Sequence, residues 1–194
     1  MVRLNTPLNT EDILSLKLGE MVFINGIIFT GRYKVHRYLA NEKPPISSMP
    51  FDLQGGVIYH CGPLLKKHDD NYSVLSAGPS TSSRVDLYQP EVIRTYNIKA
   101  IIGKGGMGIN TIKAMQECKC IYLNTISGSA VYLANRIKKV IGGYKIDEFS
   151  DIEAMWAFEV EDFPAVLTID TQGNTLHKNI KNLSSVNIIN LIQR

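Results

Sequence analysis

The stretch IIGKGGMGINTIKAMQ, residues 101–116, places a glycine-rich loop between two segments of different character. The residues before the loop, NIKAIIG, form a short apolar run rich in β-branched side chains and predict a strand. The residues after it have the apolar spacing of a helix. The predicted order is therefore strand, glycine loop, helix. A loop of this kind exposes backbone N–H groups at a helix N-terminus, where anions bind favourably.

Three interpretations of the glycine loop remain open at this point: an anion-binding loop, a KH-type loop and a tight turn. The letters GKGG match the loop of KH domains, which clamps a nucleic-acid backbone but lies between two helices. The Walker spacing of glycines and its Lys-Ser/Thr pair are absent, so the loop is not a P-loop. The third interpretation is a tight turn that carries a solvated lysine, Lys104. The strand predicted before the loop argues against the KH interpretation.

The rest of the chain predicts a mixed α/β domain with a layered sheet core, because strands dominate first and then alternate with helices. We expect one domain over residues 1–194, with a polar C-terminal tail over 180–194. The remaining predictions are a helical turn from Thr10, a strand–NG–strand hairpin over 21–31, a helix over 32–41, strands over 57–59 and 72–79, a helix broken at Pro90, a helix over 128–143, and two strands around Phe163-Pro164.

Polar and charged residues follow several of the predicted strands. Arg32 comes directly after one strand, with His36 one helical turn later, and a run of hydroxyls over 80–83 precedes Arg84. Lys104 lies in the glycine loop. Ligands of α/β folds gather at the carboxyl ends of strands, where loops and helix N-termini converge. Arginine binds carboxylates in bidentate fashion and lysine adds a point charge, so this set suits a small dicarboxylate.

Composition limits the functional classes. A formal net charge of +3 is too weak for a dedicated nucleic-acid-binding protein, whose basic residues dominate one face. The three cysteines argue against a secreted disulfide framework and favour a cytoplasmic location, and Cys118-x-Cys120 offers too few thiolates for a metal site. No basic-then-apolar signal pattern opens the sequence, and no apolar run approaches the ~18 residues that span a membrane.

Five motifs carry a family resemblance when they are taken together. They are GEMVFINGIIFTGRYKVHRYL, YHCGP, AGPSTSSRVD, IIGKGGMG and FPAVLTIDTQGNTLH. In this order and spacing they resemble the β-subunit, or C-terminal domain, of the class I iron–sulfur hydro-lyases, fumarase and L(+)-tartrate dehydratase. The resemblance covers roughly residues 5–178. It implies a swivelling β/β/α domain with a mixed sheet core.

The resemblance also implies a partner and a cofactor. A separate α-subunit would hold a [4Fe–4S] cluster through three cysteines, leaving one iron open to act as a Lewis acid on the substrate. This chain would ligate no metal and would supply part of the substrate pocket at the shared interface. Its apolar interface surface implies self-association when the chain is isolated.

Site residues follow from the resemblance motif by motif. Arg32 matches the arginine of an ARD-type motif, a carboxylate binder, and His36 matches a histidine that is an acid/base candidate. Arg84 and Lys104 match residues that contact the substrate carboxylates. Ser80 falls on the threonine that is the proposed proton-abstracting hydroxyl.

The sequence departs from the family pattern at Ser80 and at Tyr33, and other roles stay open. Serine at position 80 keeps the hydroxyl but loses the methyl group that stiffens the rotamer, and the adjacent Thr81 could present the hydroxyl instead. Ser80 could also serve as a helix cap. Tyr33 stands where an aspartate is usual, which alters how Arg32 is held. His36 has an alternative structural role, orienting Arg32.

The predicted function is that of a β-subunit in a two-component hydro-lyase. The enzyme would interconvert (S)-malate and fumarate, a reaction of the tricarboxylic acid cycle. L(+)-tartrate dehydratase is the nearest alternative, because the shared motifs do not separate the two substrates. RNA binding through the GKGG loop and a non-catalytic interaction subunit are the alternatives from other classes.

Overall fold

The computed structural model describes residues 1–69, 71–178, 180, 183–185 and 188, so most of the tail expected over 180–194 lies outside the described residues. Its elements in chain order are β1 (Val2–Asn5), α1 (Thr10–Leu14), β2 (Met21–Thr30), α2 (Tyr33–Glu42), η1 (Ile46–Ser48), β3 (Val57–Tyr59), β4 (Leu64–His68), β5 (Asn71–Ser76), η2 (Ser82–Val85), α3 (Gln89–Tyr96), β6 (Ala100–Gly103), α4 (Ile109–Cys118), β7 (Ile121–Asn124), α5 (Ala130–Ala134), β8 (Ile137–Tyr144), α6 (Ile146–Phe149) and β9 (Met155–Ile169).

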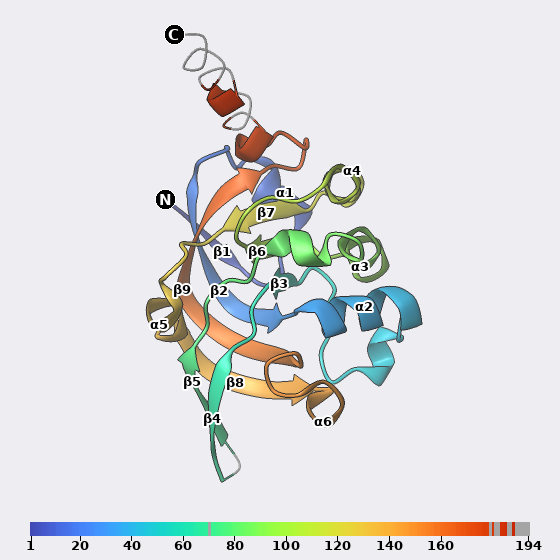
Figure 1. Cartoon of the computed structure of the whole chain (residues 1–194), viewed down its shortest axis with the longest axis vertical. Coiled ribbons are helices and arrows are strands. Elements are labelled where there is room, and N and C mark those ends of the chain that lie inside the picture. The colour runs from blue at the N-terminus through green and yellow to red at the C-terminus, as the bar shows by residue number, and fades with distance from the viewer. Residues whose placement is uncertain (70, 179, 181–182, 186–187, 189–194) are drawn as a thin grey trace.

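The main sheet has the strand order β1-β2-β3-β6-β7-β9-β8, and β9 also pairs with β2. Strands β1, β2, β3, β6 and β7 run parallel to one another, whereas β9 is antiparallel to β2, β7 and β8. The pairings β2–β3–β6–β7–β9–β2 therefore close a ring. Helices α2, α3 and α4 cover one side of this curved sheet, and the β4–β5 hairpin projects from it (Figure 1). The predicted mixed α/β fold with a mixed sheet core is confirmed.

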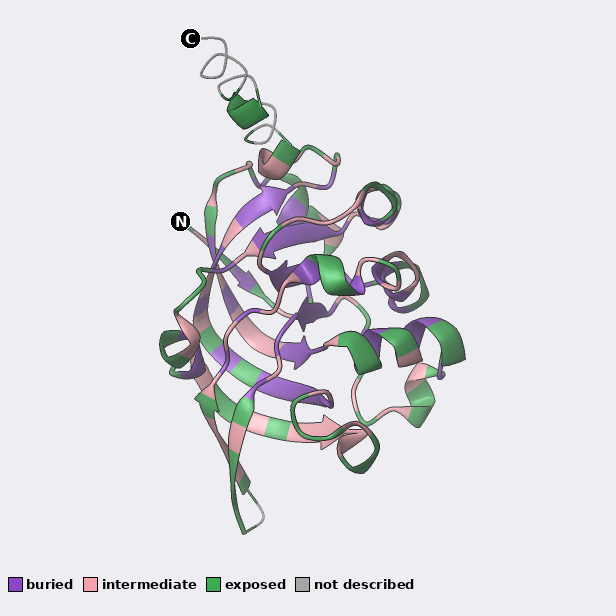
Figure 2. Ribbon diagram, viewed as in Figure 1, coloured by how far each residue is buried: buried purple, intermediate pink, exposed green. Residues whose placement is uncertain are grey.

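Two hydrophobic cores lie on the two faces of the sheet. Alternate residues of each central strand point to opposite faces, so in β6 Ala100 and Ile102 join the core inside the ring while Ile101 joins the core beneath the helices. The central strands are buried on both faces, as Figure 2 shows for β3, β6 and β7. This double burial explains why their sequences are short apolar runs rather than alternating patterns.

The hairpin predicted over 21–31 is wrong, because β2 continues through Asn25-Gly26 as one strand. A two-residue hairpin of the Asn-Gly type requires positive φ at both central residues, and here only Gly26 has it, at 95°. The register between β2 and β9 shifts between Ile24 and Gly26. The pair is therefore a β-bulge that bends a long strand around the ring.

Two further predictions are wrong at the C-terminal half. The helix predicted over 128–143 is confined to α5, and the rest of that segment forms β8 at the sheet edge. The two strands predicted around Phe163-Pro164 are the single strand β9, which carries its irregularity at Asp162, with φ at 47°. Pro90 starts α3 instead of breaking a helix, at the position where its missing N–H costs nothing.

The parallel strands bring their carboxyl ends to one edge of the sheet. Arg32 follows β2, His60 follows β3, and Lys104 follows β6. The loop after β6 leads into α4, which confirms the predicted order of strand, glycine loop and helix. The candidate residues of the sequence therefore gather where the topology predicts a ligand site.

Candidate functional site

A small cleft lies at this edge of the sheet. Its walls come from the loop after β2, the end of β3, the segment around η2 and the segment before β9. The lining residues are Gly31, Arg32, Tyr33, His60, Ser80, Thr81, Arg84, Val85 and Glu153. Four predicted site residues, Arg32, Ser80, Thr81 and Arg84, thus share one cleft. Its volume of about 40 Å³ is close to that of one water molecule and far below the roughly 300 Å³ of a typical ligand pocket.

Backbone hydrogen bonds hold the hydroxyl-rich loop against its neighbours. The N–H of Ser80 donates to the carbonyl of His60 at 2.6 Å, and the N–H of Ser82 donates to the carbonyl of Lys104 at 3.1 Å. Thr81 and Lys104 form an isolated parallel bridge. Lys104 is therefore adjacent to the cleft through its backbone, although it is not among the lining residues.

Arg32 is held from two sides. Its Nε lies 3.3 Å from Oε1 of Glu153, and the other carboxylate oxygen of Glu153 accepts the N–H of Lys34 at 3.1 Å. A Cβ atom added to Gly62 would lie 2.6 Å from Cδ of Arg32, so only glycine lets the arginine lie where it does. Glu153 lies in none of the sequence motifs, and Gly62 lies in YHCGP, although no role was predicted for it. A lone glutamate so distant along the chain gives no sequence signal of its role.

Tyr33 is part of the cleft wall. Its hydroxyl lies 3.1 Å from that of Tyr88, and the two rings meet edge to face at 5.5 Å. Where the family pattern would put an aspartate after Arg32, this chain therefore places an aromatic pair, and the carboxylate beside Arg32 comes from Glu153.

His36 lies beneath the cleft and does not line it. Its Nδ1 donates to the carbonyl of Arg32 at 2.8 Å, and burial lowers its pKa to about 4. His60 is buried beside it, with the ring centroids 4.9 Å apart, and burial lowers the pKa of His60 well below its ordinary value. Both rings are therefore neutral near pH 7.

The N-terminus of α4 carries an internal anion. The Asp86 carboxylate accepts the N–H of Gly108 at 2.8 Å and the hydroxyl of Thr111 at 2.7 Å. This helix end was expected to attract an anion, and a side chain of the protein already occupies it. The cation that the loop leaves for a ligand is Lys104.

Two cations of the site, Arg84 and Lys104, differ from Arg32 in their pairing. Within residues 1–69 and 71–178, neither Arg84 nor Lys104 forms a salt bridge, whereas Arg3, Lys43 and Arg94 each do. Cations left unpaired beside a cleft attract an anionic ligand.

The chain's own side chains do not suit an iron–sulfur cluster. Cys61 and Cys120 are buried, and burial raises the pKa of all three thiols, which opposes the thiolate form that ligates metal. Within the described part of the chain, no group of three or more His, Cys, Asp or Glu side chains could hold a metal ion.

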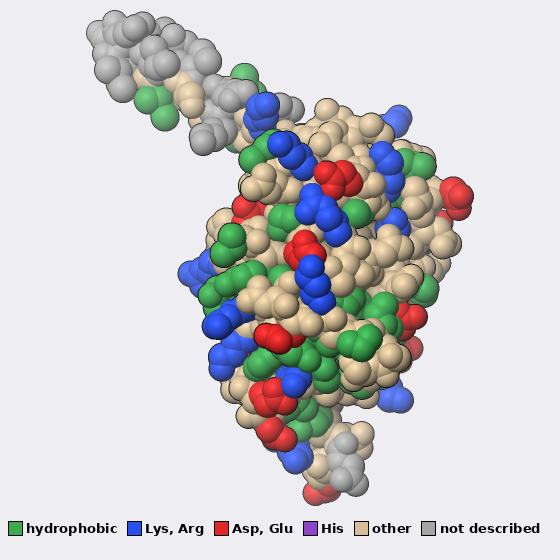
Figure 3. Space-filling model, turned by 90° about the vertical axis from the view of Figure 1, so that its right-hand side faces the viewer, with side chains coloured by type: hydrophobic (Ala, Val, Ile, Leu, Met, Phe, Trp, Pro, Cys, Tyr) green, Lys and Arg blue, Asp and Glu red, His purple; other side chains and the backbone are tan. Residues whose placement is uncertain are grey.

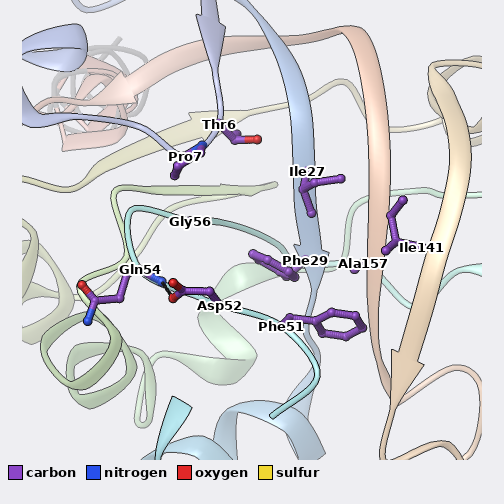
Figure 4. Close-up of a pocket in the computed structure, with 10 residues that line it drawn as sticks. All are labelled: Thr6, Pro7, Ile27, Phe29, Phe51, Asp52, Gln54, Gly56, Ile141 and Ala157. Atoms are coloured by element: carbon purple, nitrogen blue, oxygen red, sulfur yellow. Dashed lines mark hydrogen bonds between the residues drawn. The ribbon is translucent and has the colours of Figure 1, made fainter. Parts of the chain in front are cut away.

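A larger cavity lies away from these residues, with a volume of about 310 Å³. It is mostly apolar, and Figure 4 shows the rings of Phe29 and Phe51 on one side and Ile141 on another. Asp52 is its only charged lining residue, so it offers no cation to a dicarboxylate.

Comparison with known proteins identifies the family of this chain. A family model described as the C-terminus of fumarase matches residues 1–180. The chain is 44% identical over 185 residues to a Geobacillus stearothermophilus protein provisionally named class I fumarate hydratase, a match that covers 95% of this chain and 35% of that protein. It is 37% identical to a protein provisionally named L(+)-tartrate dehydratase subunit beta from Methanocaldococcus jannaschii, over 89% of each chain. The L(+)-tartrate dehydratase subunit beta of Escherichia coli is 34% identical, over 89% of this chain and 85% of that one.

The chain therefore belongs to the fumarase C-terminal family, which confirms the resemblance drawn from the motifs. It spans about a third of the length of the Geobacillus protein and most of the length of the two beta subunits. No helix within the described residues is long and apolar enough to cross a membrane.

Proposed function

We propose that this chain is the β-subunit of a two-component hydro-lyase that interconverts (S)-malate and fumarate in the cytoplasm. In the forward direction the C3–H and C2–O bonds of malate break, a C2–C3 double bond forms, and water leaves. Arg32, Arg84 and Lys104 bind the two carboxylates, and the Ser80 hydroxyl, or that of Thr81, accepts the C3 proton. The observation that carries the proposal is the shared cleft, which unites an arginine pair with this hydroxyl run beside an unpaired lysine.

The charge of the cleft suits this chemistry. Loss of the C3 proton builds negative charge on the adjacent carboxylate, and fixed cations stabilise that charge more in the transition state than in the substrate. A serine hydroxyl is a weak base by itself, so it depends on nearby cations to favour its deprotonated form. Arg84 lines the same cleft as Ser80, and Lys104 is bridged to Thr81.

The small size of the cleft supports a partner. A volume of about 40 Å³ is too small to enclose a four-carbon dicarboxylate, which supports a pocket completed by another chain. We assign that role to an α-subunit that also holds the [4Fe–4S] cluster, because the cysteines of this chain do not suit one. The beta-subunit names of two relatives support such a division.

L(+)-tartrate is the second candidate substrate, because two of the relatives carry the name of its dehydratase. RNA binding has weaker support. The GKGG loop joins a strand to a helix, and the basic side chains of the helical face are interspersed with acidic ones (Figure 3). A nucleic-acid-binding face concentrates basic residues instead.

The test is an anaerobic assay of the chain assembled with a cluster-bearing α-subunit, with fumarate followed by its absorbance. We expect fumarate from malate, and Arg84→Ala should lower kcat on the order of 100-fold with the complex intact. Arg94→Ala is the matched control, because Arg94 pairs with Glu117 on the surface of α3 and α4 and should leave kcat unchanged.

Each of the other outcomes identifies a rival. Turnover of tartrate alone would keep the mechanism and change the substrate. Normal turnover by Arg84→Ala would show that the chain is a non-catalytic interaction subunit. An intact, cluster-loaded complex that turns over neither acid would contradict the proposal, and salt-dependent RNA retention would then favour the KH interpretation.

A further inference from the structure

Behind the cleft lies a buried hydrogen-bonded cluster that the proposed reaction does not use. Its members are His36, His60, Ser82, Gln89 and Tyr122. All five side chains are fully or almost fully excluded from solvent. Polar groups buried to this extent destabilise a fold unless they are hydrogen-bonded, so a cluster of five requires an explanation.

The hydrogen bonds around His60 have one consistent direction. The amide oxygen of Gln89 can only accept, so it fixes the proton of His60 on Nε2, at 2.8 Å. Nδ1 of His60 then accepts from the Ser82 hydroxyl at 2.8 Å. The Ser82 oxygen in turn accepts from the Tyr122 hydroxyl at 2.7 Å.

The hydrogen bond of His36 fixes its tautomer as well. Its Nδ1–H donates to the carbonyl of Arg32, which leaves a lone pair on Nε2. That Nε2 and the amide Nε2 of Gln89 are both buried without a hydrogen-bond partner in the described structure. One is an acceptor and the other a donor, and the Gln89 side chain is close enough to act on the pKa of His36.

We propose that this cluster positions the substrate-binding loops relative to one another, an inference that rests on the proposed function. Three of its members contact a backbone that carries a site residue. The His36 ring holds the carbonyl of Arg32, the carbonyl of His60 holds the N–H of Ser80, and the N–H of Ser82 holds the carbonyl of Lys104. These residues are positioning residues, and none needs to touch the substrate.

Two glycines allow the cluster to pack against the strand ends. A Cβ atom added to Gly103 would overlap the Ser82 hydroxyl and lie 3.0 Å from that of Tyr122. A Cβ atom added to Gly31 would lie 2.9 Å from Cε1 of His36. The glycines at the ends of β2 and β6 therefore bring the rings and hydroxyls close to the same backbone that carries Arg32 and Lys104.

The first test uses the full chain alone and does not depend on the reaction. Nitrogen-15 NMR of the imidazole rings reports which nitrogen carries the proton. We expect His36 protonated on Nδ1 and His60 on Nε2, with neither ring becoming charged between pH 8 and 5. Rapid tautomer exchange, or protonation of His60 near pH 6.5, would overturn the proposal.

The second test measures turnover by the assembled complex. Ser82→Ala and Gln89→Met remove links of the cluster and should lower kcat by about 10- to 100-fold, because small displacements of positioned groups have effects of that size. Tyr96→Phe is the matched control. It removes another buried hydroxyl, bound to the Leu39 and Pro44 carbonyls, and should leave kcat within about 2-fold at a comparable loss of Tm.

The outcomes separate the two proposals. Fixed tautomers together with a selective loss of kcat support the positioning role. Equal losses in Ser82→Ala and Tyr96→Phe would reduce the cluster to a structural one and overturn that role. A wild-type complex without hydro-lyase turnover would overturn the proposed function and the positioning role with it, while the tautomers would still decide whether the hydrogen-bonded cluster exists.

Discussion

At the scale of single residues, the position of Arg32 depends on Glu153, which lies in none of the five motifs. The resemblance predicted Arg32, Ser80, Thr81 and Arg84 as site residues, and the structure places all four in one cleft. Their roles in binding and proton transfer stay predictions. Glu153, by contrast, comes from a segment 119 positions after Lys34, which it also contacts. A pairing over such a separation follows from the closed sheet and cannot be inferred from local pattern.

The close approach of Gly62 to Arg32 gives a prediction at this scale. In Gly62→Ala the new methyl group would lie 2.6 Å from Cδ of Arg32 and 2.7 Å from the Ile152 side chain, so the arginine has to move. We expect the KM for the dicarboxylate to rise on the order of 10-fold in the assembled enzyme, because one carboxylate contact is weakened.

Gly142→Ala is the matched control for this change. Its added Cβ would meet only the Phe51 ring, at an ordinary contact distance of 3.7 Å. KM should therefore stay at the wild-type value in that variant. An unchanged KM in Gly62→Ala would mean that Arg32 does not bind the substrate in the position that the structure shows.

At the scale of elements, local pattern predicted the short buried strands and the helices beside them, and it failed at the long bent strands β2 and β9 and at the edge strand β8. The strands β3 and β6 and helices α2 and α4 are where the sequence predicted them, because their apolar runs and periods match their burial. The segment 128–143 has basic residues that suit a helix end, yet β8 forms because β9 offers it an unpaired edge. Tertiary pairing there overrides a weak local preference.

The Asp86 cap of α4 is predicted to link an element to the site. Asp86→Ala removes the acceptor for the Gly108 N–H and the Thr111 hydroxyl. We expect the free energy of unfolding to fall by about 1–2 kcal/mol, a usual value for a lost helix cap. The assembled enzyme should also lose activity, because η2, which contains Arg84, precedes Asp86 directly and the glycine loop precedes Gly108.

Asp12→Ala separates the two effects of that substitution. Asp12 accepts the N–H of Asn9 in the capping box of α1. This helix packs into the core inside the ring through Ile13, and neither Asp12 nor Asn9 lines the cleft. Asp12→Ala should lower the free energy of unfolding by a similar amount and leave kcat unchanged. Equal activity in the two variants, measured by urea unfolding and turnover on the same preparations, would show that the cap does not position the site.

At the scale of the whole molecule, the ring of strands places its parallel carboxyl ends around two neutral histidines. The sequence could indicate a ligand site at that edge, since Arg32 and Lys104 follow predicted strands. It could not indicate that His60 would be buried against His36, because a histidine at a strand end carries no signal of its surroundings. Because both histidines are buried, the stability of the fold depends on pH.

The free energy of unfolding is expected to fall between pH 7.5 and pH 5. Burial lowers the pKa of His36 to about 4 and that of His60 further, against an ordinary value of 6.5, so the unfolded chain binds more protons within this window. Stability is complete about one pH unit above 6.5, and it declines as the pH falls through 6.5 toward 4. His36 alone should lower the free energy of unfolding by about 2 kcal/mol at pH 5, measured by urea unfolding of the isolated chain. His68→Gln, in the exposed β4–β5 hairpin, should keep the full pH dependence, whereas His36→Gln should reduce it. Equal stability at the two pH values would mean that both rings accept a proton in the folded state, which the neutral hydrogen-bonded cluster forbids.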